Sequence, residues 1–549
     1  MMSMSMSLSL AAGPHVQRDI PPTAKAACAS LNFSMKVELM HGFGEIDGYS
    51  RNSGCGYFCG RKTFRWDNGP QGFGDGSPAG NSTQWPSTLN IAATFDPVLA
   101  YEWGVAMGEE WWGKGTNILE GPGINVMRVP YNGRTFEYIS GEDPVLGSLL
   151  VGPTIDGMQQ NAMAIAKHYI LNNQETDRSG VNELVDEKTI MELYGPPFEA
   201  AAKHKVAGYM CAYNRINGVW ACEQPFTLRK MLKGFWNFTG FIVSDWGATH
   251  STSEAVNAGL DIEMPGSKFF NEAKLKASLD DGSLTMEQFD ETCVRILSPC
   301  TVLLKNGVVD GSSPGSKPLL PLSKADTKTI ALIGADAETP YTAGGGSGHV
   351  DDSNVKYGNA IADLIFGNTV PQAKLPVTMP LTGNDQGMTE HQWPGIKSAQ
   401  FPGHLEANYS EGLINGYRWY DKHKVMPAFP FGFGLTYGTF KYSDLQIEGR
   451  TISFTVIRRP DSPYAGCDTP QIYLSYPGAD SDLQVPSKVL RYFQKTCKPS
   501  TLISYTLTDR DVSNWDVAQQ MWVVTRGTYG VIAAPASQGV ESLVGSLTI

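Results

Sequence analysis

A carboxylate follows a short apolar run in residues 240–251, GFIVSDWGATHS. The β-branched and aromatic side chains of that run predict a buried strand, and Gly247 supplies a turn just beyond it. Asp245 would then lie at the carboxyl-terminal tip of the strand, where α/β proteins bind their ligands. The same residue could instead cap a following helix, and this stretch alone leaves both interpretations open.

Polar side chains of mixed charge end several other apolar segments upstream of this aspartate. Sugar hydroxyls donate to carboxylates and accept from Arg, Lys and His, while the C–H face of a sugar packs on an indole. Cations nearby would also favour the ionised form that a nucleophilic carboxylate requires. The pattern therefore predicts a site for an uncharged, hydroxyl-rich ligand such as a sugar. Its members are Arg134, Lys167, His168, Arg178, Tyr213, Asp245 and Trp246.

Single members of this set also have structural interpretations. Lys167 and His168 are neighbours, so in a regular strand they would point to opposite faces and one of them would be structural. Tyr213 could belong to the core, and Arg134 could clamp a helix or loop. Only the set as a whole favours a ligand site.

The segments that carry these residues alternate between two patterns from about residue 85 to residue 305. One set of segments is short and apolar: STLNIAATF, TNILEGP, MAIAKHYI and KVAGYMCAYN. In the other set, apolar residues recur at intervals of three and four positions, as in LAYEWGVAMGEEWWG and EKTIMELYGPPFEAAAKHK. This alternation favours parallel strands joined by right-handed helical crossovers. A (β/α)8-type barrel is the first choice, because its polar strand ends converge on one face, and a doubly wound sheet is the second.

The rest of the chain contains two segments with a different sequence pattern. Residues 306–327 are rich in Gly, Ser and Pro and predict a linker. From about residue 446 onward, apolar and polar residues alternate at period two, as is typical of an all-β sandwich. The GGGSG loop at 344–348 lacks the Lys-Ser/Thr of a phosphate loop, which argues against nucleotide binding.

The overall composition is that of a globular chain with more than one domain. It has 549 residues, of which 41% are hydrophobic and 18% charged. A net charge of -12 without any Lys/Arg run argues against a nucleic-acid partner. No apolar stretch approaches the roughly 18 residues of a membrane span. No HExxH motif, Cys-His cluster or dinucleotide fingerprint occurs, so we expect neither a metal nor a cofactor.

The cysteines and glycosylation sequons indicate in which cellular compartment the protein is found. Nine Cys and four Asn-x-Ser/Thr sequons fit a secreted or extracellular glycoprotein, although the start, MMSMSMSLSLAAGPH, lacks the basic region of a good signal peptide. Cys211 and Cys222 flank a short turn, and Cys55 and Cys59 flank a tighter one, so each pair could close a local loop. Reduced buried thiols are the alternative. The sequons begin at Asn32, Asn81, Asn237 and Asn408.

Long stretches of the chain resemble the retaining β-glucosidases of glycoside hydrolase family three. The similarity runs through WDNGPQGFG, GPGINVMRVPYNGRTFEYISGEDPVL, AIAKHYILNNQETDR, GYMCAYNRINGVWACEQP and GFIVSDWGATHS, and continues in EGLINGYRWYDKH, FPFGFGLTY and TPQIYLSYP. The resemblance implies a barrel, an α/β sandwich domain and a fibronectin type III-like domain. It also implies cleavage of terminal β-linked glucosyl or xylosyl residues from oligosaccharides or glycosides, through a covalent glycosyl-enzyme.

The resemblance assigns a role to each site residue. Asp245 would be the catalytic nucleophile, and Trp246 would form a wall at the mouth of the pocket. The family reads Asn-Asp before Gly-Pro, whereas this chain reads Asp67-Asn68, so Asn68 could replace the carboxylate through weaker, neutral hydrogen bonds. The residues expected to bind the sugar are Asp67, Arg134, Lys167, His168, Arg178 and Tyr213.

The middle of the chain departs from the family. Relatives have a long segment between the GGGSG loop and GNAIADLIFG, and it carries the glutamate that serves as general acid/base; here only HVDDSNVKY separates Gly348 from Gly358. The α/β sandwich is therefore expected to be a truncated remnant, and no proton donor is assigned. The nearby acidic residues, none in the family's motif, are Glu338, Asp351, Asp352, Glu390 and Glu411.

These observations leave an enzyme and two alternatives. A retaining glycosidase without its acid/base would be impaired, a carbohydrate-binding pseudoenzyme would share every binding residue, and a shortened gene product would expose core surface and fold poorly. The expected fold is a multidomain α/β protein. Its expected units are an N-terminal tail (1–27), a (β/α)8-type catalytic barrel (28–305), a linker (306–327), a shortened α/β sandwich domain with its own linker (328–445) and a fibronectin type III-like β-sandwich (446–549).

Overall fold

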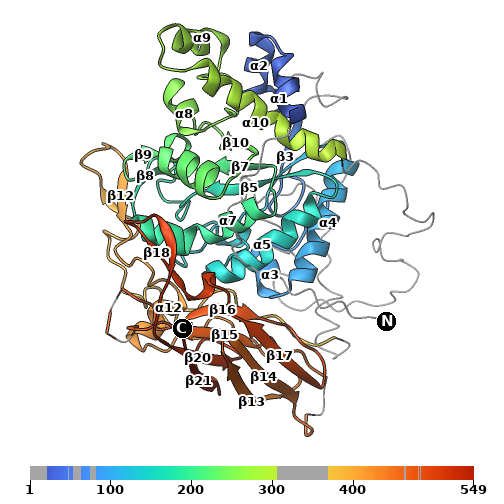
Figure 1. Cartoon of the computed structure of the whole chain (residues 1–549), viewed down its shortest axis with the longest axis vertical. Helices are drawn as coiled ribbons and strands as arrows, with labels where there is room; N and C mark the ends of the chain where they lie inside the picture. Colours follow the sequence, from blue (N-terminus) through green and yellow to red (C-terminus); the bar gives the residue numbers. More distant parts are fainter. Residues whose placement is uncertain are drawn as a thin grey trace, which may run out of the picture.

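The computed structural model places an α/β body beside a β-sandwich (Figure 1). It describes residues 22–46, 49–53, 64–74, 82–305, 369–462, 465–479, 481–482 and 484–549. Several predictions lie outside these residues: most of the N-terminal tail, the linker 306–327, the GGGSG loop, residues 328–368 of the shortened domain, Cys55, Cys59, Asn81, Glu338, Asp351 and Asp352.

The α/β body contains a seven-stranded sheet in the order β1-β2-β3-β4-β5-β7-β10. The first two strands pair antiparallel with their neighbours, and every pairing from β3 to β10 is parallel. The strands are β1 (Gly42–Ile46), β2 (Tyr49–Ser53), β3 (Phe64–Asn68), β4 (Ile118–Glu120), β5 (Met163–Tyr169), β7 (Gly208–Cys211) and β10 (Phe241–Ser244).

Two isolated bridges extend the sheet beyond β10. Val243 pairs in parallel with Ile262, and Glu263 pairs in parallel with His41, just before β1. The structure thus shows a parallel half-barrel next to a reversed hairpin, where the sequence predicted a (β/α)8-type barrel. The hairpin is antiparallel because two residues join β1 to β2, and a parallel pair needs a crossover of a dozen or more.

Helices cover the outer face of the parallel strands (Figure 1). Two long helices among them, α4 (Pro97–Gly113) and α5 (Pro144–Met158), each begin with an Asp N-cap followed by Pro. They approach closely at Gly104, where an added Cβ would stand 2.4 Å from the carbonyl oxygen of Thr154. The other helices of this body are α1 (Pro22–Ala29), α2 (Phe33–Leu39), α3 (Thr88–Ala93), α6 (Glu187–Thr189), α7 (Pro196–Lys203), α8 (Ser253–Ala258), α9 (Glu272–Asp280) and α10 (Met286–Lys305), with π-helices at Ile190–Tyr194 and Phe226–Phe235.

The C-terminal part is the β-sandwich that period-two alternation predicted. A three-stranded sheet, β13-β14-β17, faces a four-stranded sheet, β16-β15-β20-β21. Side chains such as Phe454 and Leu474 fill the core between them. The strands are β13 (Phe440–Glu448), β14 (Thr451–Arg458), β15 (Gln471–Ser475), β16 (Val489–Phe493), β17 (Ser500–Thr506), β20 (Thr528–Ala534) and β21 (Leu543–Thr548), with a separate hairpin of β18 (Ser513–Asp516) and β19 (Met521–Val524).

The segment from 369 to 439 connects the two parts. Its strands β11 (Ile396–Lys397) and β12 (Leu405–Asn408) join a small sheet with β6 (Asn182–Leu184), β8 (Arg215–Ile216) and β9 (Val219–Trp220) of the α/β body. Its helix α12 (Tyr417–His423) contributes to the buried core. Among the described residues, no helix combines the length and apolar character that a bilayer crossing would need.

Candidate active site

Asp245 directly follows β10, at the carboxyl end of the parallel strands, as predicted. Its side chain is 11% exposed, and its Oδ1 accepts hydrogen bonds of 2.8 Å from the Tyr213 hydroxyl and from the backbone N–H of Trp246. The next helix, α8, has Thr252 as its N-cap residue, so the helix-capping interpretation of Asp245 is wrong. Tyr213 packs against the main core, as its core interpretation expects, and its hydroxyl also binds this carboxylate.

The second carboxylate oxygen of Asp245 faces a histidine. His168 Nε2 lies 3.6 Å from Oδ2 of Asp245 and 3.2 Å from Nη2 of Arg134. Because arginine only donates, Nε2 must accept, which assigns the ring proton to Nδ1, 3.1 Å from the hydroxyl of Tyr138. Burial, followed by the charges of Arg134, Lys167 and Arg178, holds the pKa of His168 well below its usual range. The imidazole is therefore neutral at physiological pH.

Arg134 is held at the site by a second carboxylate. It is the N-cap residue of a 3-10 helix, Thr135–Glu137, and its Nε donates to Glu137. Burial works to lower the pKa of Arg134, but the charges of Glu137, Tyr138 and Asp245 and the hydrogen bond to Glu137 together outweigh it, so the guanidinium stays protonated. A permanent cation thus stands next to His168 and acts electrostatically on Asp245.

Lys167 and His168 both act on this site, although a regular strand would place them on opposite faces. The register of β5 against β7 shifts between Ala166 and Tyr169, so the strand is irregular where the two residues lie. Lys167 is 1% exposed, and its charge lowers the pKa of both His168 and Glu120. This irregularity explains why the expectation that Lys167 and His168 point to opposite faces does not hold.

The remaining predicted residues lie around this centre. Arg178 is at the outer edge, with its side chain 39% exposed, an ion pair of 2.7 Å to Glu175, and its guanidinium carbon 5.2 Å from the centre of the Tyr213 ring. Trp246, partly buried, packs against the main core. The roles predicted for them in sugar binding stay predictions.

The strand register separates Asp67 from Asn68. Asn68 pairs with Glu120 across β3 and β4, whereas Asp67 pairs with Leu119. Paired residues of parallel strands point to the same face, so Asn68 shares the face of Glu120. Asp67 is buried, and its charge still influences the pKa of Glu120. This arrangement supports the alternative that Asn68 stands where the family has its carboxylate.

Glu120 is a site residue that the sequence analysis missed. It ends β4 and is 2% exposed, and its pKa is influenced by the charges of Lys167, Asp67 and Asp245. Burial raises its pKa to about 8. A glutamate at the end of the apolar stretch TNILEGP is the same sequence feature that identified the other residues, and it could have revealed this one.

Of the acidic residues near the shortened segment, only Glu390 and Glu411 lie in the described part of the chain, and neither fits the role of proton donor. Glu411 forms a buried two-point ion pair with Arg128, at 2.5 Å and 3.0 Å, while the Arg128 guanidinium covers the ring of Tyr409 at 3.5 Å. Glu390 is exposed. Glu411 therefore has a structural role, in agreement with its place outside the family's acid/base motif.

Disulfides reinforce the site and the body around it. Cys211, the last residue of β7, is bonded to Cys222, as the spacing predicted, and the loop between them carries Tyr213. Two pairs that spacing did not predict are Cys28–Cys293 and Cys467–Cys497. Among the described residues, no group of three or more His, Cys, Asp or Glu side chains could hold a metal ion.

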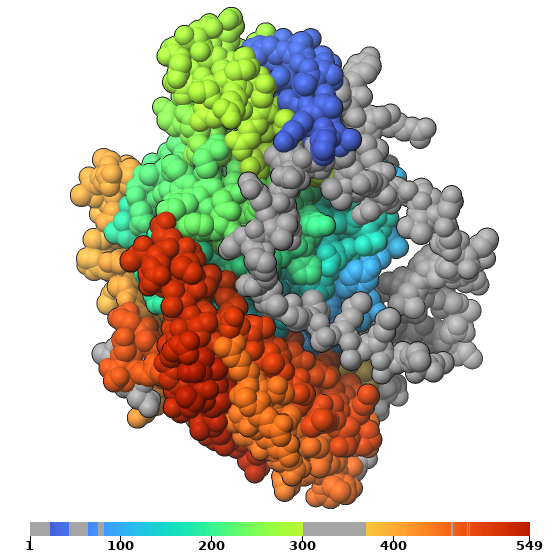
Figure 2. Space-filling model, in the orientation of Figure 1, coloured from blue at the N-terminus to red at the C-terminus, as the bar shows by residue number. Residues whose placement is uncertain are grey.

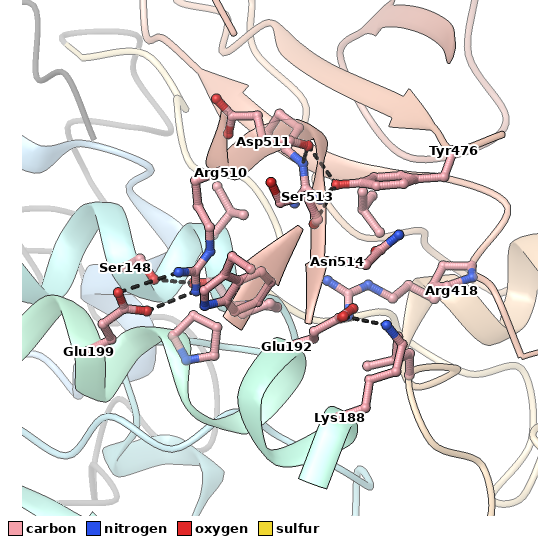
Figure 3. A pocket seen from close by; sticks show the side chains of 18 of the residues that line it. Ser148, Lys188, Glu192, Glu199, Arg418, Tyr476, Arg510, Asp511, Ser513 and Asn514 are labelled. Atoms are coloured by element: carbon pink, nitrogen blue, oxygen red, sulfur yellow. Dashed lines mark hydrogen bonds and ion pairs between the residues drawn. The ribbon is translucent and has the colours of Figure 1, made fainter. Parts of the chain in front are cut away.

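A separate cavity of about 150 Å³ lies between the α/β body and the β-sandwich (Figure 3). Its lining includes Lys188, Glu192, Glu199 and Arg510, and the carboxylates face the cations. None of the predicted site residues lines it. Figure 2 shows the sandwich lying directly against the α/β body, so we interpret the cavity as part of a charged domain interface and not as the substrate pocket.

Comparison with known proteins agrees with this geometry. Residues 71–298 match the glycosyl hydrolase family 3 N-terminal domain, and residues 468–537 match a fibronectin type III-like domain. The chain is 28% identical to the probable β-glucosidase L of Emericella nidulans, over 85% of this chain and 88% of the relative. It is 27% identical to the thermostable β-glucosidase B of Acetivibrio thermocellus, over 84% of this chain and 79% of the relative.

Solved structures agree in fold. The β-glucosidase D2-BGL from Chaetomella raphigera superposes with a TM-score of 0.79 at 25% identity, covering 96% of this chain and 98% of that one. DesR, a β-glucosidase from Streptomyces venezuelae solved with D-glucose, gives a TM-score of 0.82 at 21% identity, covering 96% and 100%. The alignment with the Emericella relative runs over 674 positions, more than the 549 residues of this chain, because that relative has segments absent here.

Proposed function

We propose, from the premise that this is a glycoside hydrolase family 3 β-glucosidase-like chain with a fibronectin type III-like domain, that it cleaves terminal β-linked glucosyl or xylosyl residues with retention. The observation that carries the proposal is the carboxylate of Asp245, fixed by two donors at the carboxyl ends of the parallel strands. A nucleophile must be oriented before the sugar arrives, and these two hydrogen bonds support that orientation.

The geometry divides the two oxygens of Asp245 between two tasks. Oδ1 is occupied by Tyr213 and the Trp246 N–H, so Oδ2 is the oxygen that would attack the anomeric carbon. The bond from Oδ2 to the anomeric carbon forms as the bond to the leaving oxygen breaks, and water then hydrolyses the glycosyl ester. The neutral His168 beside Oδ2 would not neutralise the carboxylate by ion pairing.

The sugar would be held by the charged residues around this carboxylate. Arg134 and Lys167 are buried cations, Arg178 lies at the outer edge, and Trp246 would wall the mouth of the pocket. The predicted units 28–305 and 446–549 remain part of the proposal, with the bridges at Ile262 and Glu263 extending the half-barrel toward closure. The (β/α)8-type barrel is the frame that we propose for the site.

One observation favours a second candidate, a carbohydrate-binding pseudoenzyme. A retaining glycosidase needs a proton donor about 5 to 5.5 Å from its nucleophile. Within the described part of the chain, Glu411 is held by Arg128 and Glu390 is exposed, so neither fits that role. A chain that binds sugar but cannot protonate the leaving oxygen would turn over slowly or not at all.

Covalent labelling separates the two candidates. Incubation with 2-deoxy-2-fluoro-β-glucosyl fluoride should add one fluoroglucosyl unit, and mass spectrometry of peptides should place it on Asp245, because fluoride leaves without a proton. The matched control, Asp245→Asn, should remain unlabelled. Binding of glucose without any label would favour the pseudoenzyme, and the absence of both would refute a sugar site altogether.

A secreted location fits the same proposal. Three disulfides form in the described part of the chain, and disulfides persist in oxidising compartments. Sequons at Asn32, Asn237 and Asn408 lie within the described residues. Expression in a secretory host followed by glycosidase digestion would show whether these sites are used.

A further inference from the structure

Glu120 is a buried acid that the proposed function leaves unused. It is the last residue of β4 and is 2% exposed. No hydrogen bond or ion pair to another described residue engages its carboxyl group. Burying a carboxyl without a partner is costly, so such a group is expected either to be protonated or to meet a ligand.

The direction of the Glu120 side chain follows from its neighbour Leu119. A Cβ added to Gly69 would meet both Leu119 Cδ2, at 3.2 Å, and the ring of Trp111 on α4, at 2.5 Å. Leu119 therefore points outward, toward the helices that cover the sheet. Side chains alternate along a strand, so Ile118 and Glu120 point to the other face, inside the curved sheet.

A contact across the sheet confirms that this other face is enclosed. Trp66 pairs with Ile118, and its ring lies 5.9 Å from that of Phe241 on β10. Strands β3 and β10 are not neighbours, so this contact crosses the interior. The interior surface that begins at Phe241 leads along β10 to Asp245 at the carboxyl end. Glu120 and the proposed nucleophile therefore share one enclosed face.

Lys167 brings a second buried and unpaired polar side chain to this place. Its side chain has no hydrogen bond or ion pair to any other described residue, and it is 1% exposed. It acts electrostatically on Glu120 but does not form a salt bridge with it. The carboxyl of Glu120 and the amino group of Lys167 interact electrostatically but form no hydrogen bond or ion pair. This leaves room for a polar ligand between or above them.

We infer that Glu120 is a substrate-contacting residue whose carboxyl binds a hydroxyl group of the terminal sugar, beside Lys167. The inference rests on the proposed function, since it needs a sugar in this site. It names a contact that neither the family resemblance nor the sequence pattern assigned. Glu120 positions the sugar, while Asp245 performs the attack.

The protonation state of Glu120 suits this contact. Burial raises its pKa to about 8, Lys167 lowers it, and Asp67 and Asp245 raise it; these three groups face it from β5, β3 and the end of β10. At neutral pH the carboxyl is therefore uncharged, and it can both donate to and accept from a hydroxyl. Above that pKa it would become negatively charged and lose its donor.

Two substitutions test the inference. Glu120→Gln keeps the size, the donor and the acceptor of the protonated acid, so KM for nitrophenyl β-glucoside and Kd for glucose at pH 6 should change less than about threefold. Glu120→Leu removes both polar functions, and both constants should rise about 10-fold or more. The fall in kcat/KM above pH 8 that Glu120 causes in the wild type should be absent in Glu120→Gln.

The outcomes are distinguishable from failure of the proposed function. Wild-type protein that binds glucose without turnover would refute the hydrolase, and the Kd comparison by calorimetry would still test Glu120. Equal losses in the Gln and Leu variants, or unchanged Kd in the Leu variant, would overturn the inference, as would wild-type protein that binds no glucose. If Glu120→Leu does not fold, the Kd for glucose and the pH profile of kcat/KM of Glu120→Gln test the inference instead. Glu390→Gln, which changes an exposed glutamate, is the control.

Discussion

The hydroxyl of Tyr213 donates a hydrogen bond of 2.8 Å to Oδ1 of Asp245, and it does so from a loop closed by a disulfide. Burial and the charge of Asp245 raise the pKa of Tyr213 far above its ordinary value, so the hydroxyl remains a donor throughout the working pH range. The hydrogen bond orients one carboxylate oxygen and leaves the other toward His168.

Tyr213→Phe should lower kcat/KM for nitrophenyl β-glucoside by about 10- to 100-fold. A hydrogen bond to a charged group contributes roughly 1.5 to 3 kcal/mol, and this one would fix the geometry of the attack that we propose for Asp245. Steady-state kinetics would measure the loss, and circular dichroism would confirm that the variant folds. A change below twofold would mean that Trp246 N–H alone orients the carboxylate.

Leaving-group dependence should distinguish this chain from an enzyme with a complete acid/base pair. If no carboxylic acid protonates the leaving oxygen, cellobiose should lose about 10² to 10⁴ in rate relative to nitrophenyl β-glucoside, because a nitrophenolate leaves without a proton. The thermostable β-glucosidase B of Acetivibrio thermocellus serves as the reference. A similar ratio of the two rates in both proteins would show that a proton donor is present.

The sequence predicted the strand ends that form the site, because apolar runs stop abruptly at polar residues there. Asp245, Tyr213, His168 and Arg134 accordingly meet in the structure. Glu120 ends the apolar stretch TNILEGP and so shows the same sequence feature, but the face to which it points depends on the pairing register of β4, which the sequence does not reveal.

Other features were hidden for different physical reasons. The strands β1 and β2 lie in a Gly-rich stretch without clear periodicity, so the reversed hairpin was not predicted. The register shift in β5 that lets Lys167 and His168 both act on the site depends on tertiary pairing. Cys28 and Cys293 are 265 residues apart, and spacing cannot reveal such a pair.

Removal of the Cys211–Cys222 disulfide should affect both stability and activity. The two residues close an 11-residue separation, for which chain entropy predicts about 3 kcal/mol. Because Tyr213 lies inside this loop, the double variant Cys211→Ala/Cys222→Ala should lower both Tm and kcat. The matched control is Cys467→Ala/Cys497→Ala in the β-sandwich, which should lower Tm with little change in kcat. Equal loss of kcat in both variants would contradict a local role for the first disulfide.

The interface between the α/β body and the β-sandwich should weaken in acid. Glu199 on α7 accepts a 2.8 Å ion pair from Arg510, whose guanidinium lies 3.3 Å from the centre of the Trp522 ring, and another of 2.9 Å from Lys203. Burial tends to raise the pKa of Glu199, but the charges of Arg510 and Lys203 prevail and lower it from 4.5 to about 2.

The sign of the pH dependence follows from that shift. A carboxyl whose folded pKa lies below its unfolded value stabilises the fold fully above pH 4.5, and the contribution is lost as the pH falls toward 2. The contribution amounts to about 3 kcal/mol. Glu199→Gln should therefore flatten the free energy of unfolding across this window, as measured in urea at several pH values. The exposed pair of Lys276 and Asp280 gives the control, because Asp280→Asn should leave the profile unchanged. A wild-type profile that is flat between pH 4.5 and 2 would show that the ion pair does not couple the two parts.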